Sequence, residues 1–305
     1  MIHRFCVILL ILVVSAVPFA AQTRPANELG VSAGHEHLRT MDVEAATKFW
    51  SALGGEPAAL GTAQILKFPG VFFMFQNANP QRGGGQRAGA PGGAAPTGTP
   101  PAGGAPPAAA PRGGAPAGPP QPSEGSTVEA IGFKVKSLKD SLAKWEAAGI
   151  KPLPGATARQ AFLMSPENVK VQISEDPSIT TAIATDEILM KVPNAADASA
   201  WYAKWFGAKV NRQGQATIAQ VPGMNIRIVE TKDPAAGTQG RAIDHIGFEV
   251  KNLEAFAKKL ADGGVTFNRA YAAAPAAIAP LKSIAFITDP WGTYIELNEG
   301  FANVK

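Results

Sequence analysis

The chain has 305 residues, of which 46% are hydrophobic and 17% charged, and its formal net charge is +4 at pH 7. These values are typical of a globular protein with enough chain for about two domains. Such a small net charge, with no clustered basic face, argues against a nucleic-acid-binding protein and against one that adheres to anionic lipid.

Residues 1–21 have the layout of a secretory signal peptide. His3 and Arg4 precede an apolar run from Phe5 to Val14 that is too short to span a bilayer comfortably, and small residues follow it. The only cysteine, Cys6, lies in this segment, so the mature chain is predicted to use neither disulfides nor cysteine chemistry. We expect a periplasmic or secreted bacterial protein, with a retained N-terminal anchor as the alternative.

Residues 30–79 form the first of four similar units, and a tract of Gly, Pro and Ala at residues 80–125 follows them. The tract has no apolar periodicity, so we predict a disordered spacer, for which a surface-attachment role is one hypothesis. Its two Arg-Gly-Gly triplets are not interpreted as RNA-binding in an exported chain.

The same plan returns in residues 126–180, 183–240 and 241–301: a short alternating strand, an amphipathic helix that a glycine ends, and further strands. Equivalent positions at Glu129, Asp186 and Asp244 are 57 and 58 residues apart. One such module cannot bury both its helix stripe and its sheet alone, so modules are predicted to pair. We expect module one to pair with module two, and module three with module four.

This plan resembles the vicinal oxygen chelate superfamily, which includes glyoxalase I, bleomycin-resistance proteins and extradiol dioxygenases. The resemblance is carried by HEHLRTMDVEAATKFW in module one and by DHIGFEV and DPWGTYIELNEG in module four. It implies an α+β fold in which four βαβββ modules pair into two glyoxalase-like domains, each with a cup that can hold a divalent metal.

Strand alternation supports a site in module four. Ile246, Phe248 and Val250 form an apolar stripe, so His245 faces the other way, and Glu296 likewise faces away from its neighbours Ile295 and Leu297. Both polar groups are therefore predicted to point into one concavity.

The resemblance makes His245 and Glu296 metal ligands, with Glu187 of module three as the third ligand in the same cup. It also implies that a carboxylate, Glu187 or Glu296, acts as the catalytic base on a substrate held by Mn, Ni, Zn or Fe. Arg227 would share this cup, where it binds a substrate anion or pairs with a carboxylate in the absence of metal. Besides a metal site and an ion pair without metal, the third interpretation of this cup is a metal-free ligand pocket.

The cup of modules one and two is predicted to be a degenerate partner. His35, His37 and Arg39 share one strand face and are candidates for binding a substrate anion. Ala130, Met74 and Gln172 occupy the remaining ligand positions and form a poor set for a metal.

The sequence thus predicts a metal-dependent lyase or isomerase, or a dioxygenase-like enzyme, that acts on a small oxygenated molecule. The alternative is a metal-free protein that sequesters a small molecule, as bleomycin-resistance proteins do. We expect no nucleic-acid partner and no membrane contact beyond export. A homodimer that exchanges modules is left open.

Overall fold

The computed structural model describes residues 23–79 and 118–304; the expected signal peptide and residues 80–117 of the expected spacer lie outside the described residues. Each module has the predicted strand–helix–strands order. Module one comprises β1 (Val31–Thr40), α1 (Val43–Leu53), β2 (Glu56–Leu60), β3 (Ala63–Phe68) and β4 (Val71–Asn77). Module two comprises β5 (Val128–Val135), α2 (Leu138–Ala147), β6 (Leu153–Pro154), β7 (Gln160–Met164) and β8 (Lys170–Glu175).

Modules three and four repeat this order, and module four has an additional C-terminal turn. Module three comprises β9 (Ile183–Val192), α3 (Ala195–Phe206), β10 (Lys209–Gln213), β11 (Ala216–Val221) and β12 (Met224–Glu230). Module four comprises β13 (Ile243–Val250), α4 (Leu253–Asp262), β14 (Phe267–Ala273), β15 (Ser283–Thr288), β16 (Tyr294–Glu299) and the 3₁₀ turn η3 (Phe301–Asn303).

Each helix begins at a polar side chain that accepts hydrogen bonds from the first helical N–H groups. The residues are Asp42, Ser137, Asn194 and Asn252. Such N-caps satisfy amides that otherwise lack an intrahelical partner. The start of each helix is therefore fixed by local sequence.

The modules combine into two eight-stranded sheets. Sheet I has the order β14-β15-β16-β13-β1-β4-β3-β2, and sheet II the order β10-β11-β12-β9-β5-β8-β7-β6. Sheet I therefore joins module one to module four, and sheet II joins module two to module three. Our expectation that each cup is built by modules adjacent in sequence is wrong.

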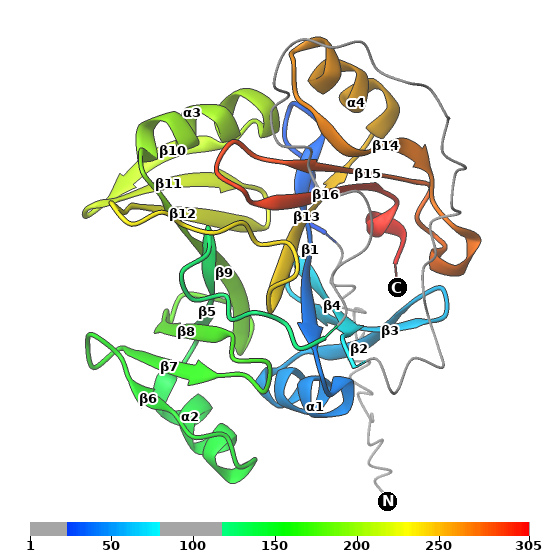
Figure 1. The fold of residues 1–305 in the computed structure, drawn as a ribbon. Coiled ribbons are helices and arrows are strands. Elements are labelled where there is room, and N and C mark those ends of the chain that lie inside the picture. The colour runs from blue at the N-terminus through cyan, green and yellow to red at the C-terminus, as the bar shows by residue number, and fades with distance from the viewer. Residues whose placement is uncertain (1–22, 80–117, 305) are drawn as a thin grey trace, which may run out of the picture.

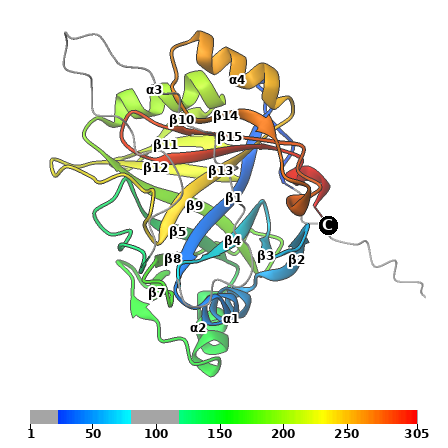
Figure 2. The same ribbon diagram turned by 45° about the vertical axis from the view of Figure 1, so that its right-hand side comes forward.

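Within each sheet, the two modules are joined through their first strands. β1 pairs with β13 and β5 pairs with β9, both antiparallel. Modules adjacent in sequence do contact one another, but through their apolar faces: the Phe206 and Phe248 rings are 4.4 Å apart. The helices of modules three and four consequently lie together at the top of the molecule and those of modules one and two at the bottom (Figures 1 and 2).

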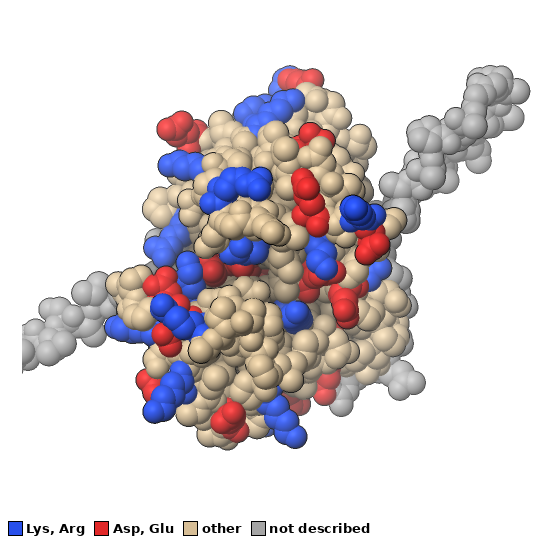
Figure 3. Space-filling view, turned by 90° about the vertical axis from the view of Figure 1, so that its left-hand side faces the viewer, with Lys and Arg blue, Asp and Glu red and all other residues tan. Residues whose placement is uncertain are grey.

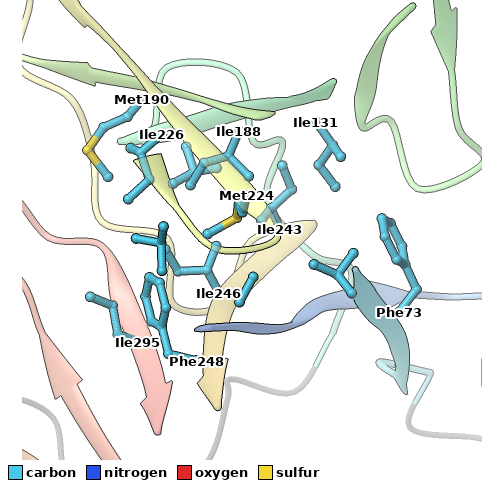
Figure 4. Close-up of a cluster of buried hydrophobic side chains, with 14 of the residues drawn as sticks. Phe73, Ile131, Ile188, Met190, Met224, Ile226, Ile243, Ile246, Phe248 and Ile295 are labelled. Atoms are coloured by element: carbon cyan, nitrogen blue, oxygen red, sulfur yellow. The ribbon is translucent and has the colours of Figure 1, made fainter. Parts of the chain in front are cut away.

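One hydrophobic cluster spans both sheets. Figure 4 shows Ile188 and Ile226 of sheet II pointing toward Ile246 of sheet I, with Phe248 and Ile295 beside it, and all five are buried. The predicted apolar stripe of β13 lies in this cluster. Its opposite face is buried as well, because all eight residues of β13 are buried. The polar residues of β13 therefore do not face bulk water.

The end of the predicted spacer is ordered. Ser123 is fully buried, and its Oγ accepts a hydrogen bond of 2.7 Å from the backbone N–H of Ile243. Gln121 forms a parallel bridge with Arg241. Residues 118–125 thus pack beside the start of β13, and the prediction that the spacer extends to residue 125 is wrong. Hydrogen bonding to the neighbouring backbone, which composition does not reveal, accounts for the difference.

No helix among the described residues is long and apolar enough to cross a bilayer. The α+β architecture of four βαβββ modules is confirmed.

Candidate metal centre

A bulge in the first strand of module four positions the candidate ligand His245. His245 pairs with His37 and Ile243 pairs with Leu38, so Asp244 between them has no partner residue on β1. Consecutive residues of a regular strand point to opposite faces, but a bulge alters this direction. As a result, Oδ1 of Asp244 lies 2.7 Å from Nδ1 of His245. The imidazole is thereby oriented with its other nitrogen, Nε2, toward the centre of the sheet.

Four side chains meet on the concave face of sheet I: His35 and His37 of β1, His245 of β13 and Glu296 of β16. The atoms with which they could bind a metal all lie within 4.8 Å of one another. Strand register explains the convergence, because His37 is paired with His245, and Gly247 is paired with both His35 and Glu296.

Glu296 is the central member of the cluster. Its Oε2 lies 2.7 Å from Nε2 of His245 and 3.3 Å from Nε2 of His35. Its Oε1 accepts a hydrogen bond of 2.8 Å from Nδ2 of Asn298. A carboxylate between two imidazoles is the arrangement that the opening and closing strands of module four were predicted to produce.

A glycine makes room for His35. A Cβ added to Gly247 would lie 2.1 Å from Cε1 and Nδ1 of the His35 ring. Any larger residue at this position would displace the imidazole, because the ring lies directly over the β13 backbone. The glycine in the DHIGFEV motif is therefore part of the site.

Burial and neighbouring charges set the protonation of the cluster. Burial alone would lower the pKa of His245, but hydrogen bonds to Asp244 and Glu296 outweigh it and raise the pKa to about 9. Burial, with the charges of His245 and His35, lowers the pKa of His37 to about 3. Burial would raise the pKa of Glu296, yet the charge of His35 and the bond from His245 hold it well below its ordinary range. At pH 7 the centre thus contains a carboxylate, a neutral His37 and a protonated His245.

The residues present suit a divalent metal. Nδ1 of His35 and Nδ1 of His37 are buried and have no hydrogen-bond partner among the described residues. Buried polar atoms are normally paired, so unpaired imidazole nitrogens indicate a missing ligand. Three imidazoles and one carboxylate are suitable for first-row divalent ions, and Asp244 behind His245 is the usual outer partner of a metal-bound histidine. The cluster could therefore bind a metal ion.

The two sides of the cluster differ in accessibility. On one side the Phe301 ring of η3 is fully buried, 4.9 Å from the His35 ring and 5.5 Å from the Phe72 ring. Glu249 fixes this turn by accepting hydrogen bonds from the backbone N–H groups of Gly300 and Phe301. On the other side Phe286 and Tyr294 are only half-buried. A substrate would therefore approach the cluster from the Phe286–Tyr294 side.

Glu187 and Arg227, which we predicted to share a cup with His245, lie on sheet II. Nε of Arg227 donates to Oε1 of Glu187 at 2.6 Å, and Nε2 of Gln172 lies 3.4 Å from the same oxygen. The expected four-residue site is thus divided between two sheets, because module three pairs with module two. Glu187 and Arg227 form the ion pair that we considered as the metal-free alternative. Figure 3, seen from the side of sheet II, shows basic and acidic side chains interspersed around a hollow.

His35, His37 and Arg39 also differ from the prediction. The two histidines belong to the main cluster and not to a separate degenerate cup. Arg39 is 2% exposed, and its Nη1 donates to the carbonyl oxygen of Gly240 at 2.8 Å. It therefore anchors the backbone at Gly240.

Two contributors were missed in the sequence, Asp244 and Phe301. Asp244 directly precedes His245 in the sequence. Its contact with the His245 ring was not expected, because consecutive residues of a strand without a bulge point to opposite faces. Phe301 follows the last strand, and its sequence gives no sign that it folds back over β1.

The fold is shared with solved structures of low sequence identity. Glyoxalase I from Zea mays superposes with a TM-score of 0.60 at 13% identity, covering 90% of this chain and 94% of that one. A candidate dioxygenase from Bacillus subtilis subsp. subtilis strain 168 gives a TM-score of 0.54 at 11% identity, covering 92% and 88%. At these identities the similarity concerns the fold alone. No curated protein sequence matches the chain.

A family model matches residues 184–297, which are modules three and four. Its description is Glyoxalase/Bleomycin resistance protein/Dioxygenase superfamily. The match covers β13 and β16 and therefore includes His245 and Glu296. It confirms, for modules three and four, the resemblance found in the sequence: residues 184–297 belong to the glyoxalase/bleomycin resistance protein/dioxygenase superfamily.

Proposed function

We propose that the protein is a divalent-metal-dependent enzyme that acts on a small molecule with two neighbouring oxygens. The reaction belongs to the lyase, isomerase or dioxygenase-like types of this superfamily. The observation that supports the proposal is the buried cluster of His35, His37, His245 and Glu296, whose ligand atoms lie within 4.8 Å of one another.

The four residues would hold the ion from three strands of one sheet. Bound there, Mn, Ni, Zn or Fe would act as a Lewis acid on the neighbouring substrate oxygens. His37 offers a neutral imidazole at pH 7, since its pKa is about 3. His245 must first release a proton. Asp244 then fixes the ring orientation through Nδ1, as outer-sphere carboxylates commonly do.

We assign proton transfer to Glu296, the single carboxylate among the four. Its Oε1 stays bound to Asn298, whereas its Oε2 lies between two imidazoles, where it can accept a substrate proton. Phe301 excludes water from the side of His35, which strengthens electrostatic interactions at this carboxylate. Glu187, on the other sheet, is not part of this proposal.

Metal analysis of the full chain tests the proposal. After dialysis against Mn, Ni, Zn or Fe(II), we expect one ion per chain, removable by a chelator with loss of thermal stability. Addition of the ion should then restore the melting temperature. A wild-type protein that takes up no ion in any of these conditions would contradict the proposal and favour a metal-free binding protein.

We also propose that the protein acts after export, on the basis of residues 1–21. Mass spectrometry of protein from a bacterial periplasm is expected to show a chain that starts near residue 22. The variant Leu10→Arg should interrupt the apolar run and retain the precursor in the cytoplasm. An unprocessed wild-type chain in the cytoplasm would contradict this part of the proposal.

A further inference from the structure

We infer that Arg269 and the Tyr294 hydroxyl form a binding site for an anionic group of the substrate, on the open side of the candidate metal centre. The inference rests on the proposed function and narrows its substrate class. The substrate would carry two neighbouring oxygens at one end and a carboxylate, or another anion of similar size, at the other end.

The strand register places Arg269 in line with the cluster. Arg269 of β14 is paired with Phe286 of β15, which in turn is paired with Glu296 of β16. β14 has register shifts on both sides of Arg269, but Arg269 itself is paired with Phe286. Directly paired residues of antiparallel strands lie on the same face, so all three side chains share the concave face of sheet I. With strands about 4.8 Å apart, the Cα atoms of Arg269 and Glu296 are separated by about 10 Å. A small molecule that contacts Glu296 at one end can therefore reach Arg269 at the other.

Arg269 has no charge partner among the residues that the structure describes. It is half-buried, and its guanidinium makes no hydrogen bond or ion pair with any residue between 23 and 79 or between 118 and 304. Arg227 and Arg39, by contrast, are bonded to Glu187 and to the carbonyl oxygen of Gly240. A partly desolvated guanidinium normally has an acceptor, and its fork of donors suits a carboxylate.

Tyr294 adds a second donor beside Arg269. Its hydroxyl makes no hydrogen bond within the described part of the chain, although the residue is only half-exposed. Its ring is stacked on that of Phe286, the residue paired with Arg269, so the two donors lie on the same side of the sheet. The hydroxyl can therefore donate to an anion that Arg269 binds.

An aromatic surface connects the anion site to the metal ligands. The Phe286 and Tyr294 rings are stacked, with centroids 5.1 Å apart and an angle of 19° between their planes. Each ring is nearly perpendicular to the His245 imidazole, at 5.5 and 5.6 Å. A flat substrate could lie against these rings with its oxygens toward His245 and its anionic group toward Arg269. The opposite side of the cluster offers no such surface, because Phe301 closes it.

Two probes of nearly the same shape test this inference by calorimetric titration. The probe 3,4-dihydroxybenzoate has neighbouring oxygens and a carboxylate at the far end of its ring, whereas 4-methylcatechol has a methyl group in place of the carboxylate. Both are titrated into the metal-loaded full chain, after its metal content has been measured. The variants are Arg269→Gln, Arg269→Lys and Tyr294→Phe, with Arg212→Gln as the control. Arg212 is an exposed residue of β10 on sheet II.

We expect Arg269→Gln to weaken binding of 3,4-dihydroxybenzoate by about 10- to 100-fold, the range for a charge-assisted hydrogen bond. Its affinity for 4-methylcatechol and its metal content should stay within about twofold of the wild type. Arg269→Lys should recover part of the loss, and Tyr294→Phe should weaken binding of the carboxylate probe by a few-fold. The control variant should bind both probes as the wild type does.

Equal affinities of wild type and Arg269→Gln for the carboxylate probe would overturn the inference. A protein without metal would instead contradict the proposed function. The anion site is tested even then, since the metal-free chain should still prefer the carboxylate probe through Arg269. Loss of that preference in the metal-free wild type would refute the site as well.

Discussion

Sheets I and II are built from the same module in the same way, yet only sheet I has the side chains for a metal centre. At the position of His245, sheet II has Glu187, and at the positions of His35 and Glu296 it has Ala130 and Arg227. Gly132 makes room for Glu187 as Gly247 does for His35, because a Cβ there would lie 2.7 Å from Cγ of Glu187. The scaffold is thus the same in sheet II, while an ion pair occupies positions that correspond to the candidate metal ligands.

The comparison shows that core and site are specified by alternate residues of the same strands. Ile188 and Ile246 occupy equivalent core positions in β9 and β13, and both are buried. Their neighbours Glu187 and His245 face the two cups. A change on the cup face leaves the apolar face intact. The two cups can therefore carry different side chains on the same fold.

The largest expected effect comes from replacing His245, the central histidine of the sheet I cup, with alanine. His245→Ala removes the imidazole that Asp244 orients, so we expect loss of stoichiometric metal in dialysis followed by elemental analysis. The matched variant Glu187→Ala should retain one ion per chain. Equal metal content in the two variants would mean that the cups are not distinguished as we describe.

The second prediction concerns pH. The pKa of His245 is raised from 6.5 to about 9, so its protonation stabilises the folded metal-free chain below pH 6.5, and this contribution is lost as the pH rises through 9. Metal must displace this proton. Metal affinity should therefore rise about tenfold per pH unit between pH 7 and 9 and then level off. Competition titrations against a chelator at several pH values would measure it. In the Glu187→Ala variant the same profile is expected.

The third prediction compares the two bulges. Asp244→Asn keeps a hydrogen-bonding group beside His245 but removes its charge, so metal affinity should fall about 10- to 100-fold. Asp186 occupies the equivalent bulge of sheet II, 3.2 Å from Nζ of Lys134. Asp186→Asn should leave metal affinity unchanged. A loss in both variants would indicate a general effect on folding, which circular dichroism would detect.

The smallest effect should arise within sheet II. Arg227→Ala removes the partner of the buried Glu187 carboxylate, and we expect a loss of about 1–3 kcal/mol in the free energy of unfolding. Burial already raises the pKa of Glu187 in spite of Arg227. The double variant Arg227→Ala/Glu187→Gln should regain part of the stability. Denaturant titration measures both changes, and an unchanged midpoint for Arg227→Ala would contradict a structural role for the pair.

Much of the fold followed from local patterns, whereas the choice of modules that build each cup did not. Helix caps, glycine ends and the alternation at His245 and Glu296 are encoded within a few residues. Which first strands pair is decided by contacts across about 200 residues of chain, between Val31 and Val250. Modules adjacent in sequence do pack together, through rings such as Phe206 and Phe248, but this contact builds the core and not the cup.

One signal could have corrected the assignment. A pairing of module one with module four brings His35 and His37 to His245 and Glu296, which gives three imidazoles and a carboxylate. The pairing that we predicted would have put an arginine beside the ligands. Counting compatible donors for each alternative pairing would have favoured the observed one. The role of Phe301 depends on a backbone turn after the last strand, and no residue pattern predicts that turn.

Because β1 pairs with β13, the four residues of the cluster can come together only late in synthesis. His35 and His37 leave the ribosome more than two hundred residues before Glu296, so a nascent chain presents an incomplete set of donors for most of its elongation. All four residues could hold an ion only after β1 and module four have met. Metal identity would then be decided by the ions present in the compartment where the finished chain closes.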